Sequence, residues 1–201
     1  MNKIIFWDFD GVIADTFHQS FTIVKMVYPD MTELEYRARF EGNINKTLLR
    51  TPPVREINFF EEFEKTIFNA PLTEGIASVI QELSKRYSNI IISSTLSDLI
   101  DRYLIHNNLR QYFAEIMGNE VAHSKTEKLT LAFDKHTTSN KHSLLITDTL
   151  GDIREANEVQ VPVIAVPWGF QTRETLEKGN PTIIVENTNE LLNKVNEMLS
   201  V

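Results

Sequence analysis

Two aspartates, Asp8 and Asp10, stand directly after the short apolar run Ile4–Trp7. Such a run predicts a buried strand, and side chains two residues apart on an extended chain point to the same side. Gly11 follows and permits a sharp turn. Carboxylates paired in this way could bind a cation or attack a phosphate ester. Taken alone, the pair is better explained by turn formation.

Hydroxyl groups follow the second apolar run, Asn89–Ile92. Ser94 could donate its hydroxyl to a phosphate oxygen, or it could cap a helix that begins near Leu96. The two interpretations are equally consistent with the residue type. Ser93 or Thr95 could take either part.

A lysine, Lys125, precedes the helical stretch Thr126 to His136. A single lysine in this position is normally a solvated surface charge. It could instead neutralise a phosphate, and Lys128, one helical turn further on, competes for that part.

Two more aspartates, Asp148 and Asp152, lie beyond the apolar run Ser143–Ile146. Asp152 has a simple structural explanation, because an acid in the first turn of a helix is favoured by the helix dipole. Asp148 ends a strand that should be buried, where an unpaired carboxylate is costly. A cation is its natural partner.

All four segments follow strands, so the elements that position them decide whether they meet. Short apolar runs alternate with helix-length amphipathic stretches along most of the chain, which indicates parallel strands buried on both faces. The fold class predicted is a doubly wound, mostly parallel α/β sheet with a Rossmann-like core. The predicted strands are Ile4–Trp7, Asn89–Ile92, Glu115–Met117, Ser143–Ile146, Val163–Val166 and Thr182–Val185. The predicted core helices are Thr73–Tyr87, Leu96 to Leu109, Thr126 to His136, Asp152 to Val159 and Asn189 to Leu199.

Ligands of such sheets bind at the carboxyl ends of the strands. Asp8 and Asp10, with Asp148 or Asp152, would then surround one point. Oxygen ligands without histidine or thiol favour a hard ion such as Mg²⁺. A hydroxyl and a lysine beside it would complete a receptor for a phosphate dianion.

The alternation is interrupted after the first strand. Stretches 16–28, 33–41 and 56–69 have helical spacing of apolar residues, and prolines and a glycine separate them. We therefore expect an inserted helical cap at 16–71 within a core formed by 1–15 and 72–201.

Composition excludes several classes of function. The net charge of −8 argues against a nucleic-acid or acidic-membrane binder. The absence of cysteine excludes thiolate metal sites and cysteine nucleophiles. No signal-peptide pattern or membrane-length apolar run is present, so we expect a cytoplasmic protein.

The four segments, in this order, resemble the four motifs of the haloacid dehalogenase (HAD) superfamily, and the resemblance covers the whole chain. Its most specific part is the first motif, Asp8-Phe9-Asp10-Gly11-Val12-Ile13-Ala14-Asp15-Thr16. The helical insert lies where this family carries its small cap. The loop Pro167-Trp168-Gly169-Phe170 is similar to one in the phosphoglycolate-phosphatase and β-phosphoglucomutase-like members.

The resemblance implies a Mg²⁺-dependent phosphatase, a monomer or small homo-oligomer whose partner is a small phosphorylated molecule. Asp8 would be the nucleophile and Asp10 the general acid and base. Ser94, with Thr95 beside it, and Lys125 would hold the phosphoryl group. The metal ligands implied are Asp8, the backbone carbonyl of Asp10, Asp148 and Asp152. The chain departs from the family pattern at Thr147, where many relatives have glycine, and at Thr126, where proline is common.

Other activities of the same superfamily stay open. A phosphomutase of the β-phosphoglucomutase type would pass the phosphoryl group to a sugar, and a non-catalytic binding module would keep only the fold. A dehalogenase is disfavoured because it needs no second acid at the position of Asp10. The sequence does not identify the substrate. Lys46, Arg50 and Arg55 of the insert could contact an anionic tail of the substrate, and His18 could reach the site.

Overall fold

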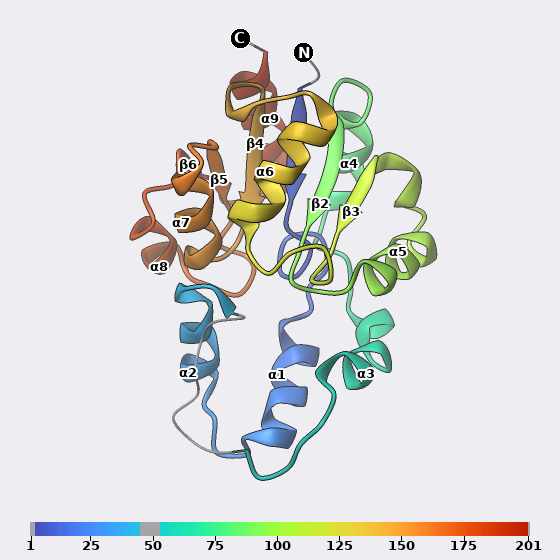
Figure 1. Ribbon diagram of the computed structural model, residues 1–201, viewed down its shortest axis with the longest axis vertical. Helices are drawn as coiled ribbons and strands as arrows, with labels where there is room; N and C mark the ends of the chain where they lie inside the picture. Colours follow the sequence, from blue (N-terminus) through green and yellow to red (C-terminus); the bar gives the residue numbers. More distant parts are fainter. Residues whose placement is uncertain (1–2, 45–52, 201) are drawn as a thin grey trace.

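Six parallel strands form one sheet at the centre of the computed structural model, which describes residues 3–44 and 53–200 (Figure 1). Their order is β3-β2-β1-β4-β5-β6. The doubly wound, mostly parallel fold predicted from the sequence is confirmed. The strands are β1 (Ile4–Trp7), β2 (Ser88–Ile92), β3 (Glu115–Met117), β4 (Ser143–Thr147), β5 (Val163–Ala165) and β6 (Ile183–Ile184).

Strand β1 lies at the middle of the sheet. Phe6 is in register with Ile90 of β2 on one side and with Leu145 of β4 on the other. Every residue of β1 is buried, which explains its continuous apolar sequence. The chain winds outward from β1 in both directions, so the ends of β1 and β4 form the crevice in which such sheets bind ligands.

Helices cover both faces of the sheet. Successive residues of β1 contact different layers: Trp7 belongs to the cluster that includes α4, α5 and α9, whereas Phe6 belongs to the cluster that includes α6, α7 and α8. This alternation follows from the two-residue period of a strand. The helices are α4 (Ile76–Leu83), α5 (Ser97–His106), α6 (Lys125–His136), α7 (Leu150–Glu158), α8 (Arg173–Glu177) and α9 (Thr188–Leu199).

A second group of helices lies beyond the carboxyl ends of the strands, at the end of the molecule opposite to the two termini (Figure 1). It contains α1 (Phe17–Val27), α2 (Glu33–Ala38), the 3-10 turn η1 (Arg39–Glu41), α3 (Phe59–Glu64) and the turn η3 (Ile67–Asn69). All fall within the segment 16–71. That this segment is a separate cap domain stays a prediction.

Two stretches of the insert that were each expected as one helix are divided. The stretch 33–41 is divided between α2 and η1. The stretch 56–69, expected as one helix, is divided between α3 and η3. Thr66 lies at the division, where its backbone amide and its hydroxyl both bond to the carbonyl of Phe63, at 3.0 and 3.2 Å. A threonine that bonds locally in this way competes with helix continuation.

The remaining elements are short. Helix α8 was not expected from the sequence, and five residues are too few to show a helical period. The turns η4 (Arg110–Tyr112) and η5 (Asn140–His142) precede β3 and β4. Along the described chain, no helix is both long enough and apolar enough to cross a bilayer.

Candidate active site

The first motif begins where β1 leaves the sheet. The amide of Asp8 still donates to the carbonyl of Ile146, at 2.9 Å, and Gly11 then turns the chain with φ of +74°. A Cβ atom at Gly11 would lie 2.1 Å from Oδ2 of Asp148. Glycine is therefore required both by the backbone conformation and by the close approach of the fourth motif to the first.

Asp8 is buried among donors at the end of β1. Its Oδ1 lies 2.8 Å from Nζ of Lys125 and accepts a hydrogen bond from the amide of Phe9 at 2.8 Å. The hydroxyl of Thr147 lies 3.4 Å from Oδ2. These contacts fix the orientation of the carboxylate.

Burial raises the pKa of Asp8 well above its usual range, and this outweighs the opposing charge of Lys125. The neighbouring charges of Asp152 and Asp148 raise it further. Burial penalises the charged form of a carboxyl group. Positive charge close to Asp8 favours its ionised form and opposes this shift.

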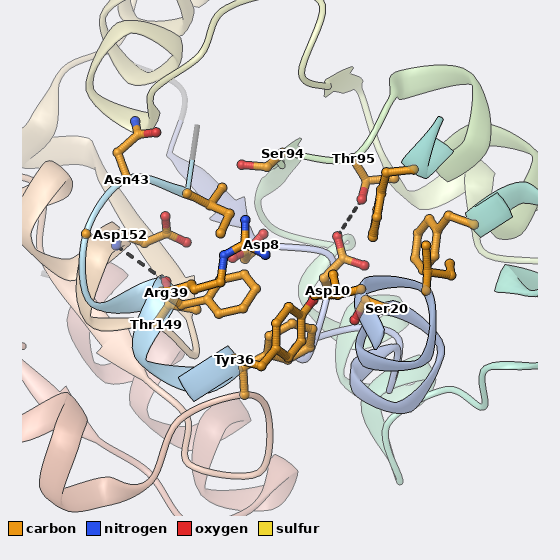
Figure 2. A pocket seen from close by; sticks show the side chains of 18 of the residues that line it. Asp8, Asp10, Ser20, Tyr36, Arg39, Asn43, Ser94, Thr95, Thr149 and Asp152 are labelled. Atoms are coloured by element: carbon orange, nitrogen blue, oxygen red, sulfur yellow. Dashed lines mark hydrogen bonds between the residues drawn. The ribbon is translucent and has the colours of Figure 1, made fainter. Parts of the chain in front are cut away.

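Asp10 is held by hydroxyl groups from its own motif and from the loop after β2. Thr95 donates to its Oδ2 at 2.7 Å (Figure 2). Thr16 donates to Oδ1 at 2.7 Å, and Ser93 lies 3.3 Å from Oδ2. Burial raises the pKa of Asp10, while the hydrogen bonds from Thr16 and Thr95 oppose the shift.

The hydroxyl cluster after β2 is divided between two tasks. Ser93 and Thr95 are buried and contact Asp10, whereas Ser94 lines the cavity beside them. Leu96 occupies the N-cap position of α5 and makes no side-chain cap bond. Ser94 is therefore not the N-cap of that helix, and that it binds phosphate stays a prediction.

The two lysines of α6 make different contacts. Nζ of Lys125 lies 2.8 Å from Asp8 and 3.4 Å from Asp152, and it also donates to the carbonyl of Ile92. Nζ of Lys128 donates to the carbonyl of Ser93 at 2.5 Å. Lys125 is thus the lysine of the carboxylate cluster, and Lys128 supports the loop after β2.

The placement of Lys125 follows from the start of α6. Ser124 is the N-cap, and its side chain accepts from the amide of Glu127 at 3.1 Å. The amide of Lys125 donates to Glu155 of α7 at 2.5 Å. Both contacts direct the first turn of α6, with its lysine, toward the end of β1.

Asp148 and Asp152 have different surroundings. Asp148 is fully buried, and its Oδ2 accepts from the amide of Phe170 at 2.6 Å, while Oδ1 has no hydrogen-bond partner. Burial raises the pKa of Asp148 to about 8, opposed by the bond from Phe170. Oδ2 of Asp152 is already paired, with Thr147 at 2.9 Å and Lys125 at 3.4 Å.

The site offers oxygen ligands of the kind that Mg²⁺ prefers. Among the residues that the structure describes, no three acidic, histidine or cysteine side chains form a metal site by themselves. The unpartnered Oδ1 of Asp148 and the excess of buried negative charge around Asp8 are nevertheless what a hard cation would satisfy. The residues fit the ion if a backbone carbonyl completes the set.

A cavity of about 370 Å³ opens over these groups. Its core side includes Asp8, Asp10, Ser94, Lys125 and Asp152, and the helices of the insert form the other side. The five residues come from the ends of different strands and the first turns of helices, and the fold brings them together as predicted.

The insert also contributes a cation that sequence reasoning missed. Arg39 of η1 is partly buried and lines the cavity (Figure 2). Its pKa is lowered by burial. The residue gave no sequence signal, because its position in a helical stretch is typical of a surface charge. Only the docking of η1 over the strand ends identifies it.

The basic residues singled out in the sequence lie elsewhere. Arg55 is exposed, does not line the cavity and donates to the carbonyl of Met26 at 2.8 Å. His18 is exposed on α1. Lys46 and Arg50 lie outside the described residues.

Hydrogen bonds join the insert to the core around the cavity. Asn43 donates to Glu155 at 2.6 Å and to the carbonyl of His123 at 2.9 Å. On the other side of η1, Gln171 donates to the carbonyl of Arg37 at 3.0 Å, and Arg37 donates to the carbonyl of Phe170. The insert is thus closed over the strand ends in this conformation.

The profile of one protein family, described as haloacid dehalogenase-like hydrolase, matches residues 4–166. The match includes all four motif segments. The chain belongs to this family. This haloacid dehalogenase-like hydrolase is accordingly an enzyme, as the motif resemblance implied.

Relatives of this HAD-like hydrolase that span it end to end are named phosphatases. It is 24% identical to a phosphoglycolate phosphatase of Synechococcus elongatus over 99% of each chain. It is 22% identical to the pyrophosphatase PpaX of Oceanobacillus iheyensis over 97% of each chain. Its fold matches the crystal structure of a predicted phosphatase from Clostridium acetobutylicum with a TM-score of 0.80, at 18% identity and over 98% and 99% of the two chains.

Proposed function

We propose that this hydrolase is a Mg²⁺-dependent phosphatase that cleaves a small-molecule phosphate monoester through an aspartyl phosphate on Asp8. The observation that carries the proposal is the pairing of Asp8 Oδ1 with Lys125 Nζ at 2.8 Å, at the floor of a covered cavity. A buried carboxylate next to a lysine can attack phosphorus, because the lysine offsets the negative charge of the phosphoryl oxygens.

In the first step, a carboxylate oxygen of Asp8 attacks phosphorus, and the bond from phosphorus to the ester oxygen breaks. Asp10 donates its proton to that departing oxygen. The raised pKa of Asp10 supports this role, because a general acid must begin protonated. The hydroxyls of Thr16 and Thr95 hold its two oxygens in place.

Electrostatics decides whether the attack is feasible. A carboxylate repels a phosphate dianion by roughly 4 kcal/mol per pair of unit charges at about 4 Å and an effective dielectric near 20. Lys125 reverses the sign of one such interaction, and the hydroxyl of Ser94 adds a hydrogen bond to the phosphoryl oxygens. Stabilisation of this charge is the main source of catalysis in phosphoryl transfer.

Asp148 would hold Mg²⁺ through Oδ1, together with Asp8 and the backbone carbonyl of Asp10. When bound, the ion supplies positive charge that favours ionised Asp8 and stabilises the phosphoryl oxygens. Because Oδ2 of Asp152 contacts Thr147 and Lys125, this oxygen would position Lys125, and ligation of the ion by Asp152 would fall to Oδ1.

In the second step, Asp10 accepts a proton from a water molecule whose oxygen attacks phosphorus, and the bond from phosphorus to Asp8 breaks. Inorganic phosphate is released and Asp8 is regenerated. Residues 16–71 would act as the cap that excludes bulk water and contacts the leaving group. Arg39 is the cap cation best placed to meet negative charge on the substrate.

The decisive experiment is to trap the intermediate. Enzyme mixed with substrate and quenched in acid within one turnover should carry one phosphoryl group on the peptide that contains Asp8, with a burst of released alcohol. Asp8→Asn should show neither. Steady hydrolysis of the ester without burst or phosphopeptide, at a rate that Asp8→Asn leaves unchanged, would exclude the proposed covalent route.

The alternative mutase is tested by the fate of the phosphoryl group. A phosphatase releases phosphate containing oxygen from isotope-labelled water. A mutase would return the group to a second hydroxyl of a sugar phosphate without label. A non-catalytic binding module would do neither.

A further inference from the structure

The cavity wall that α1 and α3 supply is apolar. The rings of Phe59 and Phe63 stack with centroids 5.4 Å apart, and Phe60 meets Phe59 edge-on at 5.7 Å. Six side chains make up this apolar wall: Ile23, Val24, Val27, Phe59, Phe60 and Phe63. It is continuous with the carboxylate floor, since Asp8 and Asp10 line the same cavity.

The proposed general acid stands at the foot of the apolar wall. Thr16, which donates to Asp10 at 2.7 Å, is the N-cap of α1, and Ser20 of the same helix lies near Asp10 in the cavity (Figure 2). A group that protonates the ester oxygen must be within hydrogen-bond reach of it. The leaving group therefore begins at Asp10 and extends along α1 and α3.

Within α1 and α3, the wall offers one polar side chain to a leaving group, and Tyr28 and Tyr36 line the cavity beside it. Ser20 is the polar residue that α1 and α3 add to the described lining, and its hydroxyl already donates to the carbonyl of Thr16 at 2.9 Å. Within the described lining, Arg39 is the charged residue from the insert, and it belongs to η1 rather than to this wall. A carboxylate or second phosphate placed against the wall would lose its hydration without compensation.

The dimensions agree with a leaving group larger than glycolate or phosphate. The cavity of about 370 Å³ falls within the ~300–1,000 Å³ typical of pockets for drug-sized ligands. Aromatic side chains in the wall favour edge-to-face or offset contacts with a ring. An apolar ring placed there would gain from burial, whereas a small polar group would leave much of the wall facing water.

We propose that the preferred substrate is a phosphate monoester whose alcohol carries an apolar ring, bound against the wall formed by α1 and α3. This inference rests on the proposed phosphatase function. The proposed substrate differs from phosphoglycolate and pyrophosphate, the small polar molecules in the names of the relatives, because neither of these has an apolar group.

The test compares two alkyl phosphates with similar leaving-group chemistry, ethyl phosphate and 2-phenylethyl phosphate. The wild-type enzyme with Mg²⁺ should hydrolyse the phenylethyl ester with a kcat/KM at least about tenfold higher, because even one methylene in an apolar pocket changes discrimination by roughly 10-fold or more. Phosphoglycolate, measured alongside, should be a poorer substrate than the phenylethyl ester.

Variants then assign the preference to the wall. Val27→Asn places an amide in it and should reduce the phenylethyl-to-ethyl ratio by about tenfold, and circular dichroism and the melting temperature check its folding. Phe60→Leu, a milder change, should reduce the ratio in the same direction. The matched control is Leu34→Asn, since Leu34 is an exposed apolar residue of α2 that does not line the cavity, and its ratio should equal that of wild type.

A ratio near one in the wild type, or phosphoglycolate as the better substrate, would overturn this inference and leave the phosphatase function intact. A high ratio that Val27→Asn and Phe60→Leu both leave unchanged would also overturn it, because the ring would then bind elsewhere. Failure to hydrolyse any of the three esters would instead remove the proposed function on which the inference depends.

Discussion

Thr95 donates its hydroxyl to Oδ2 of Asp10 at 2.7 Å, so the loop after β2 holds the second aspartate of the loop after β1. The sequence separates these residues by more than eighty positions, and the parallel pairing of β1 with β2 brings them together. Both residues were expected at the site, Thr95 as a phosphate ligand. Its hydroxyl position makes it a support for the proposed general acid, and its contact with phosphate stays a prediction.

Asp10→Asn should affect esters according to their leaving group. Loss of the proposed acid should slow an alkyl phosphate by about 100-fold or more, within the usual range for general acid catalysis. A p-nitrophenyl ester should be slowed less in its first step, because its leaving group departs without a proton. The burst phase measures that step for each ester. An equal loss for both would contradict the acid role.

Asp8→Asn should lower kcat by roughly a thousandfold or more, since removal of a nucleophile abolishes the covalent route. The amide is nearly the same size, and removing a buried charge should not unfold the protein. Circular dichroism and the melting temperature check the fold. Turnover near the wild-type rate in a well-folded variant would rule out Asp8 as nucleophile.

Lys125→Met and Lys128→Met should separate the two buried lysines. Loss of Lys125 removes the cation beside Asp8 and Asp152 and should reduce kcat by at least about 100-fold. Lys128 donates instead to the loop carbonyl of Ser93. Its replacement by methionine should lower the melting temperature more than kcat. Comparable losses of kcat in both variants would reject this division of roles.

Chelation by EDTA should abolish activity, and Mg²⁺ should restore it better than Ca²⁺, which prefers looser coordination. Mg²⁺ should also raise the melting temperature of the wild type, because an ion that binds only the folded state stabilises it. Asp148→Asn should require more Mg²⁺ for both effects. Full activity in excess chelator would refute the metal assignment.

Arg39→Gln should raise KM for an ester that carries extra negative charge by about tenfold, as expected for one lost charged contact. Acetyl phosphate serves as the reference substrate. Arg55→Gln is the matched control, because Arg55 is exposed and does not line the cavity. If the two variants behave alike, Arg39 does not contact the substrate.

Much of this protein was predictable from residue types and their spacing. The strand β1 and the acids that follow it are readable because a strand buried on both faces is continuously apolar and because polar residues mark its end. The same reasoning located Ser94, Lys125 and Asp148, and it correctly predicted a mostly parallel α/β sheet. Short elements such as α8 were not predicted, because five residues are too few to show the period of a helix.

Tertiary structure alone decided which of several similar residues meet. Lys125 and Lys128 lie one turn apart on α6 and are both buried, yet only the angle at which α6 packs on the sheet directs Lys125 to Asp8. Arg39 was indistinguishable in the sequence from Arg55, and the docking of η1 over the strand ends separates them. Spacing along the chain determines which face of an element a side chain occupies, whereas contacts between distant elements depend on packing that no local pattern contains.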